Sequence, residues 1–225
     1  MASVTADAYN EHMRQRVQGR LLDLVCGKVP FYEFYRDLVS EVVCVDWPGS
    51  AHGNQHVDTV ANLTIPLPLE DESCDTILAS SVLEHLPEPA VFWSEVSRII
   101  RPGGRIIMTV PFLDRIHESP HDYCRHTDFA LRRGAENCGL EVELLEPLGG
   151  APVVICDNVA KVAVQAGGLG ELAAIAMQGS CEWFRRTSLG GLVVRKTAIV
   201  QPSNCFLILR KPTAATEHER DISGN

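Results

Sequence analysis

Four short segments of almost uninterrupted apolar residues constrain the fold of this chain more than any other feature. They are RLLDLV (20–25), EVVCVD (41–46), DTILAS (75–80) and RIIMTVPF (105–112). Strands that are covered on both faces have this composition, which is typical of parallel sheets. The runs therefore predict a sheet with helices on both sides.

Helical patterns lie between these runs. Residues 31–39 form a short one, and 89–100 is clearer because Pro89 stands near its start and Pro102-Gly103-Gly104 follows it. Residues 127–138 have Thr127 as a capping residue and Gly139 just past the end. The alternation predicts a doubly wound α/β fold.

The pattern changes after residue 150. The segment 151–178 is rich in Ala and Val and predicts one or two helices broken at Gly167-Gly168. CFLILRK (205–211) predicts a last strand, and the polar residues after it predict a loose tail.

Charge and composition exclude several classes of partner. The 225 residues have a formal net charge of -9, which argues against a nucleic-acid surface rich in Lys and Arg. The N-terminus lacks the apolar core of a signal peptide, and no uninterrupted apolar run reaches the length of a membrane span. The eight cysteines contain no Cys-x-x-Cys pair and are expected to be reduced core residues. We therefore expect a cytoplasmic protein that does not bind membranes.

A parallel sheet binds ligands beyond the carboxyl ends of its strands. Polar residues follow each of the four runs at this edge, among them Asp46, which lies 46 − 27 = 19 residues beyond Gly27. This spacing is close to the ~20 residues at which an acid meets the two hydroxyls of a ribose. The alternative is that Asp46 is a solvated acid in a turn.

The order of the motifs resembles the class I S-adenosylmethionine-dependent methyltransferases. The matching blocks are LLDLVCGKVPF, EVVCVD, IPLPLEDESCDTILASSVLEHL, EVSRIIRPGGRIIMTVPF and HESPHDYCRHTDFALRRGAENCGLEV, over roughly residues 20 to 148. They are most similar to a bacterial small-molecule branch whose glycine loop reads Gly-Cys-Gly-x-x-Pro-Tyr. The resemblance implies a Rossmann-like seven-stranded sheet with an antiparallel last strand and a helical insertion before it.

The resemblance also implies a division of the chain and a cofactor, S-adenosylmethionine, with S-adenosylhomocysteine as product. The division is an N-terminal helical segment (1–19), a cofactor-binding core (20–150), a helical lid or substrate subdomain (151–200), a final strand (201–212) and a flexible tail (213–225). The implied cofactor-binding residues are Asp23, Val25, Cys26 and Gly27 near the methionine part, Asp46 and Trp47 near the ribose, Asn62 and Leu63 near the adenine, and Ser80 and Ser81 along the cofactor.

Two of these positions depart from the family pattern. Val25 stands where glycine is usual, and a β-branched residue disfavours positive φ and adds two methyl groups near the cofactor. Asn62 stands where an acid commonly accepts a hydrogen bond from the adenine amino group. This change is mild, since an Asn carbonyl oxygen can also accept.

Methyl transfer from a sulfonium is an in-line displacement that depends mainly on alignment, and a base helps when the nucleophile is a hydroxyl. His85, His117 and His121 fall on segments expected to border the methyl group, so they are the catalytic candidates. Two structural alternatives stand beside them: His85 can orient a loop, and Asp122 can form a bracing ion pair with Arg125. A metal site at His117, His121 and His126 is the weaker idea, and no metal is expected.

These observations favour a methyltransferase that acts on a small molecule, at a hydroxyl of a sugar or secondary metabolite, and that forms a possible homodimer. The alternative, raised by Val25, is a degenerate methyltransferase-like binding or scaffold protein. An NAD-dependent dehydrogenase carries little weight, because the chain lacks a Gly-x-Gly-x-x-Gly turn.

Overall fold

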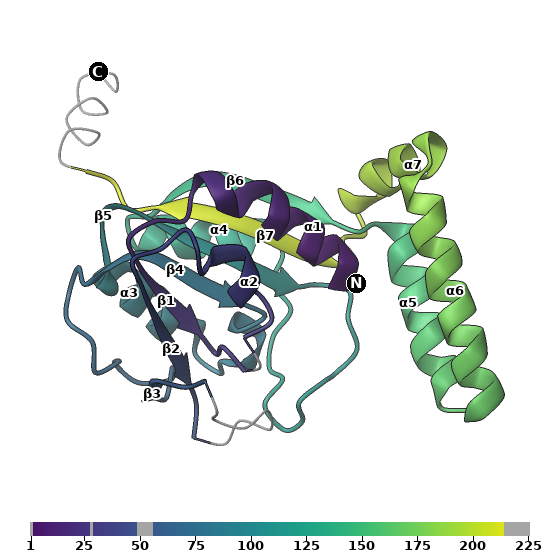
Figure 1. The fold of residues 1–225 in the computed structure, drawn as a ribbon, viewed down its shortest axis with the longest axis horizontal. Coiled ribbons are helices and arrows are strands. Elements are labelled where there is room, and N and C mark those ends of the chain that lie inside the picture. The colour runs from purple at the N-terminus through teal and green to yellow at the C-terminus, as the bar shows by residue number, and fades with distance from the viewer. Residues whose placement is uncertain (1, 28, 49–55, 214–225) are drawn as a thin grey trace.

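A seven-stranded sheet forms the centre of the computed structural model, which describes residues 2–27, 29–48 and 56–213 (Figure 1). Its order within these residues is β3-β2-β1-β4-β5-β7-β6. The strands are β1 (Arg20–Leu24), β2 (Glu41–Asp46), β3 (Thr59–Val60), β4 (Cys74–Ser80), β5 (Ile100–Pro111), β6 (Glu141–Leu148) and β7 (Asn204–Arg210).

The sheet is parallel from β3 to β5, and β7 runs antiparallel to both β5 and β6. The register sets Leu78 of β4 beside Ile107 of β5, and Ile107 beside Ile208 of β7. This topology confirms the predicted doubly wound α/β sheet with an antiparallel last strand. The apolar-run analysis had not located β3 and β6, because β3 has two residues and β6 contains four glutamate or proline positions among its eight.

Helices cover both faces of the sheet. The helices α1 (Ala2–His12) and α2 (Tyr32–Tyr35), with the short η1 (Met13–Gln15), lie on one face. The helices α3 (Pro89–Ile99) and α4 (Asp128–Asn137) lie on the other. Thr127 caps α4 as expected, since its side chain accepts a hydrogen bond from the Ala130 N–H.

The two layers account for the apolar runs. Along β4, Ile77 and Ala79 join the core cluster that contains α3 and α4, whereas Leu78 joins the cluster that contains α1 and α2. The same alternation holds for Ile106 and Ile107 in β5. Successive side chains of a strand point to opposite faces of the sheet. A strand that is buried on both faces therefore needs apolar residues at consecutive positions.

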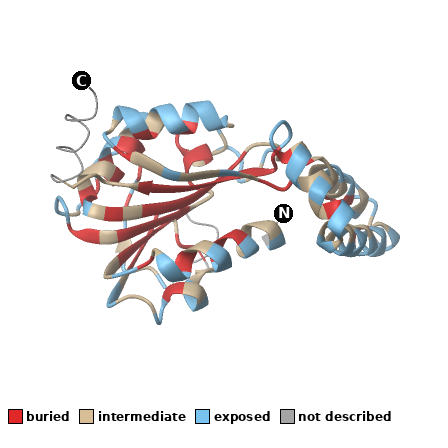
Figure 2. Ribbon diagram, turned by 90° about the horizontal axis from the view of Figure 1, so that it is seen from above, coloured by how far each residue is buried: buried red, intermediate tan, exposed pale blue. Residues whose placement is uncertain are grey.

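A helical insertion leaves the sheet between β6 and β7, as expected. Figure 2 shows it projecting away from the body of the molecule. It consists of α5 (Ala151–Val164), α6 (Gly168–Arg186) and α7 (Ser188–Ala198). A Cβ at Gly150, whose φ is +108°, would lie 2.4 Å from the Val194 carbonyl oxygen, so only glycine fits at the start of the insertion.

Several element boundaries differ from the predicted ones. The helix expected over 31–39 is limited to α2, and the strand expected from residue 105 already begins at Ile100. Apart from Thr213, the predicted tail 213–225 lies outside the described residues. No helix within the described ranges has the length and hydropathy to cross a membrane.

Candidate functional site

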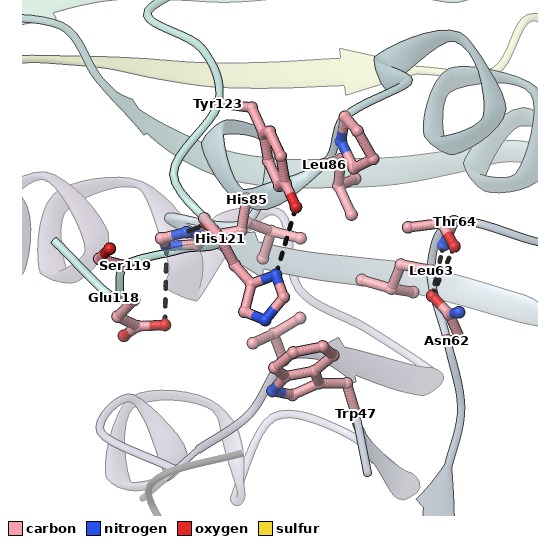
Figure 3. Close-up of a pocket in the computed structure, with 13 residues that line it drawn as sticks. Trp47, Asn62, Leu63, Thr64, His85, Leu86, Glu118, Ser119, His121 and Tyr123 are labelled. Carbon is pink, nitrogen blue, oxygen red and sulfur yellow. Dashed lines mark hydrogen bonds and ion pairs between the residues drawn. The ribbon is translucent and has the colours of Figure 1, made fainter. Parts of the chain in front are cut away.

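A cavity of about 370 Å³ lies at the carboxyl edge of the sheet (Figure 3). Its volume is typical of a small-molecule site. Residues from five successive loops line it, among them Val25 after β1, Trp47 after β2, Asn62 and Leu63 after β3, His85 in the single-turn η2 (Leu83–His85) after β4, and His121 after β5. This edge is where a doubly wound sheet binds its ligands.

The cavity unites six of the thirteen predicted site residues. The predicted residues that do not line it are Asp23, Cys26, Gly27, Asp46, Ser80, Ser81 and His117. All of these except His117 lie at or just after the ends of β1, β2 and β4. The sequence analysis missed other lining residues, such as Thr64, Glu118 and Tyr123, which are near neighbours of predicted positions.

The loop after β1 keeps a glycine-like backbone at Val25. The φ of Val25 is +57°, in the left-handed region that β-branched residues avoid. Its N–H donates to the Val45 carbonyl oxygen at 2.7 Å, and the Cys26 N–H donates to the same oxygen at 3.2 Å. The loop is thus fixed to the end of β2 despite the strain, which costs about 1–2 kcal/mol.

Asp46 joins the loops after β1 and β2. One carboxylate oxygen accepts from the Gly27 N–H at 3.1 Å and the other accepts from the Trp47 N–H at 2.8 Å. The side chain is buried at the end of β2. Asp46 is therefore an ordered acid and not a solvated one, and each oxygen has a second lone pair.

Asp23 is a second buried acid close to this loop. Its carboxylate accepts a hydrogen bond from the Tyr35 hydroxyl at 2.7 Å, and its residue is 5% exposed. Burial raises the pKa of Asp23 to about 7, in spite of the Tyr35 hydrogen bond, and the nearby charge of Asp46 adds to the increase. A cation placed beside Asp23 would favour its ionised form.

Asn62 is held by its own loop. Its carbonyl oxygen accepts from the Thr64 N–H at 2.9 Å and from the Thr64 hydroxyl at 2.8 Å. These two bonds use both lone pairs of that oxygen. A hydrogen bond from the adenine amino group to this oxygen would be its third.

The serines after β4 are fixed to β5. The Ser80 hydroxyl lies 3.0 Å from the Thr109 hydroxyl, and the Ser81 N–H donates to the Thr109 carbonyl oxygen at 2.9 Å. Ser81 has a φ of +55°. The chain thus turns sharply at Ser81 before it enters η2.

The loop after β5 (112–127) is docked onto η2. The Nδ1 atom of His85 lies 2.6 Å from the His121 carbonyl oxygen, and the Tyr123 N–H donates to the Glu84 carbonyl oxygen at 2.8 Å. His85 therefore orients this loop, which was the structural alternative for its role.

The expected ion pair between Asp122 and Arg125 is also present. The two guanidinium nitrogens of Arg125 lie 2.5 and 2.9 Å from the two carboxylate oxygens of Asp122. Arg125 holds the pKa of Asp122 well below its usual range. The pair braces the loop, because Arg125 also donates to the Arg115 carbonyl oxygen.

His121 lines the cavity, as His85 does. Its Nδ1 atom lies 3.2 Å from the Tyr123 hydroxyl, and its ring meets the Trp47 ring edge-on with centroids 4.6 Å apart. Figure 3 shows His121 between these two aromatic side chains, on the opposite side of the cavity from Asn62 and Leu63. The two aromatic groups restrict the orientation of the imidazole.

His117 does not line the cavity and lies beside the buried carboxylate of Glu84. Its Nε2 atom is 3.7 Å from Glu84 Oε1, and Glu84 raises the pKa of His117 to about 9. Among the described residues, the acids and histidines spaced for a metal ion are Glu84, His85 and His117. The three histidines suggested by the sequence, 117, 121 and 126, do not form such a group together.

Comparisons with known proteins agree with this architecture. The family described as "Methyltransferase domain" matches residues 22–108. A protein of Mycolicibacterium smegmatis named "Probable S-adenosylmethionine-dependent methyltransferase" is 32% identical over 49% of this chain and 44% of its own length. The ubiquinone biosynthesis O-methyltransferase of Mesorhizobium japonicum is 31% identical over 62% of this chain and 61% of its own.

Solved structures share the fold at low identity. The crystal structure of the [4+2]-cyclase SpnF has a TM-score of 0.58 and 18% identity, over 93% of this chain and 80% of that one. The chain spans less than two thirds of the length of the first curated relatives that it matches.

Proposed function

Because the chain belongs to the class I S-adenosylmethionine-dependent methyltransferases, we propose that it transfers the methyl group of S-adenosylmethionine to a hydroxyl of a small molecule. The cavity at the carboxyl edge carries this proposal, since five successive loops converge on it. S-adenosylmethionine would supply the electrophilic methyl group, and the protein would supply binding, alignment and a base.

Residues that line the cavity, and others at the strand ends next to it, would bind the parts of this cofactor. Asp46 offers two carboxylate oxygens for the ribose hydroxyls, and the buried Asp23 offers a negative charge for the methionine ammonium. Cys26 and Gly27 form the turn between them, and Asn62 with Leu63 would flank the adenine. Ser80 and Ser81 would lie along the cofactor after β4.

Isothermal titration with S-adenosylhomocysteine tests the cofactor half of the proposal. We expect one site per chain in the wild type and a loss of affinity in Asp46→Ala. As a matched control, Asp58→Ala removes an acid from the segment before β3, where Asp58 accepts from the Cys44 N–H outside the cavity lining. An absence of binding at millimolar ligand would overturn the proposal.

We assign the role of general base to His121. It lines the cavity, and two aromatic neighbours fix its ring. His117 is a poorer candidate because it does not line the cavity. His121→Gln should lower methyl transfer by about 10²–10⁴-fold while S-adenosylhomocysteine binding is retained. Equal loss of both would assign His121 to cofactor binding instead.

The acceptor is proposed to be a hydroxyl of a sugar or secondary metabolite. The 31% identity to a ubiquinone biosynthesis O-methyltransferase supports oxygen as the methylated atom. A radiolabelled methyl-transfer assay against panels of phenols, sugars and amines tests this class. Transfer to amines alone would contradict it.

A binding or scaffold protein without turnover is the second candidate, favoured by the strained Val25 at the cavity wall. The shared fold of a [4+2]-cyclase is consistent with it, since a fold does not determine a reaction. This candidate predicts that Val25→Gly creates a cofactor affinity that the wild type lacks. If the wild type already binds and Val25→Gly changes little, the candidate is excluded.

The helical insertion is proposed to serve as substrate subdomain and as contact in a homodimer. Lys161 of α5 pairs with Asp114 of the loop after β5 at 2.5 Å, which couples the insertion to the site. Large apolar side chains are exposed on it, including Leu169, Leu172 and Trp183. Light scattering at several protein concentrations tests the dimer, and a monomer at all concentrations would exclude it.

A cytoplasmic location is also part of the proposal. All eight cysteines are free thiols, and Cys156 and Cys181 are partly exposed. Free thiols are typical of proteins in a reducing compartment. Fractionation of cells that express the chain tests the location, and recovery outside the cytoplasm would contradict it.

A further inference from the structure

Glu84 is the most unusual polar group in the described part of the molecule. Its residue is completely buried, and neither of its carboxylate oxygens has a hydrogen-bond partner. A buried carboxylate without a hydrogen bond is costly, and such groups in native proteins are normally hydrogen-bonded, paired with a cation or bound to a metal.

Two histidines flank this carboxylate. The Nε2 atoms of His85 and His117 lie 3.6 and 3.7 Å from Glu84 Oε1, and their rings meet edge-on with centroids 5.0 Å apart. These distances are too long for hydrogen bonds. They are close to the about 3.3 Å that separates two ligand atoms of a tetrahedral ion with bonds of about 2.0–2.1 Å.

The other ring nitrogen of each histidine is engaged by a backbone carbonyl. His85 Nδ1 lies 2.6 Å from the His121 carbonyl oxygen, and His117 Nδ1 lies 3.1 Å from the Arg115 carbonyl oxygen. A carbonyl oxygen can only accept, so both Nδ1 atoms carry a proton. A metal ion that displaces the second proton of His117 would then bind each ring through the lone pair of Nε2. Metal-binding histidines are fixed in the same way by a hydrogen bond at the second nitrogen.

We propose that Glu84, His85 and His117 bind a divalent first-row transition metal ion, of which Zn²⁺ is the first to test. Their potential ligand atoms all lie within 4.8 Å of one another. Two imidazoles and one carboxylate form a ligand set that suits Zn²⁺ or Fe²⁺ better than Mg²⁺. Three protein ligands leave a coordination position for a further oxygen.

The position of this site gives the ion a role that rests on the proposed function. His85 lines the cavity, and so does Glu118, whose carboxylate lies 3.9 Å from His85 Nε2. An ion held by His85 would therefore lie at the cavity wall, where it could bind the acceptor hydroxyl. Such binding lowers the pKa of the hydroxyl and aligns it for methylation.

Titration of chelator-treated full-length protein with Zn²⁺, followed by calorimetry, tests the site. We expect one ion per chain in the wild type and at least about 100-fold weaker binding in His117→Ala and Glu84→Gln. His12→Ala is the matched control, because it removes an imidazole that faces a carboxylate elsewhere, with Nε2 3.5 Å from Glu146. Every variant keeps the eight cysteines, so binding to thiols cancels in the comparison.

Zn²⁺ should also raise the melting temperature of the wild type but not that of His117→Ala. His117 is partly exposed, so this variant should remain folded even if Glu84→Gln does not. Absence of stoichiometric binding in the wild type, or binding that survives in His117→Ala, would overturn the proposal. S-adenosylhomocysteine binding, measured on the same samples, reports separately on the proposed function, because His117 does not line the cavity.

Discussion

The buried Asp23 makes a quantitative prediction about pH. Its folded-state pKa of about 7 lies above the value of about 3.9 for an unfolded aspartate. The folded chain therefore binds more protons than the unfolded chain between these two values. This contribution to stability is complete below about pH 4 and is lost as the pH rises to about 7, where the total loss is about 4 kcal/mol.

Asp23→Asn removes this loss, since Asn is neutral at every pH and its carbonyl oxygen can still accept from the Tyr35 hydroxyl. Urea unfolding of both proteins at pH 5 and pH 8 measures the effect. The two pKa values predict that the stability of the variant relative to wild type increases by about 2.5 kcal/mol from pH 5 to pH 8. Other titrating groups cancel in this double difference. If the difference in stability between the variant and the wild type did not depend on pH, the raised pKa of Asp23 would be refuted.

The same linkage predicts the pH dependence of cofactor binding. If the cofactor ammonium binds the ionised form of Asp23, the affinity for S-adenosylhomocysteine should be about tenfold higher at pH 8 than at pH 6. Asp23→Asn should bind more weakly and without this dependence, so the variant would gain stability and lose function. Equal affinities of the wild type at the two pH values would contradict the assignment of Asp23 to the methionine end.

Three further substitutions test other parts of the structure. Val25→Gly relieves the strain of a φ of +57° but removes the packing of the Val25 side chain against the core. We therefore expect calorimetry to show little change in the melting temperature and a change of less than about tenfold in the affinity for S-adenosylhomocysteine. Arg125→Ala leaves the buried Asp122 carboxylate without its cation, so the free energy of unfolding in urea should fall by about 2–3 kcal/mol. If Arg125→Lys had the stability of the wild type, the bidentate geometry of the pair would not matter. Gly134→Ala would place a Cβ 2.4 Å from Trp93 Nε1 and should destabilise the fold by about 1–3 kcal/mol. Gly179→Ala is the control, because the space around Gly179 is open, and it should be neutral or stabilising. Equal effects of the two substitutions in thermal melts would refute the packing argument.

The sequence predicted the central strands well, because strands that are buried on both faces consist of consecutive apolar residues. Ile77, Leu78 and Ala79 are consecutive and all buried, as expected in a strand that is covered on both faces. β3 left no comparable mark, because Thr59 and Val60 pair with β2 at the edge and are not fully buried. Its position was implied only by the resemblance to a family.

The candidate site was predictable to the extent that its residues follow strands in sequence. Val25, Trp47, Asn62 and His85 each come soon after a strand and meet at one cavity. The environment of Glu84 was not predictable, because it depends on the fold of the loop after β5. His117 lies 117 − 84 = 33 residues beyond Glu84 in the sequence. The fold of this loop brings His117 next to Glu84, where His85 also lies.

A crystal structure with S-adenosylhomocysteine bound tests the central claim most directly. The account predicts adenine between Asn62 and Leu63, ribose hydroxyls at Asp46, and the sulfur atom facing the side of the cavity formed by His85 and His121. A ligand bound elsewhere, or none at saturating concentration, would contradict the claim that this cavity is a cofactor site.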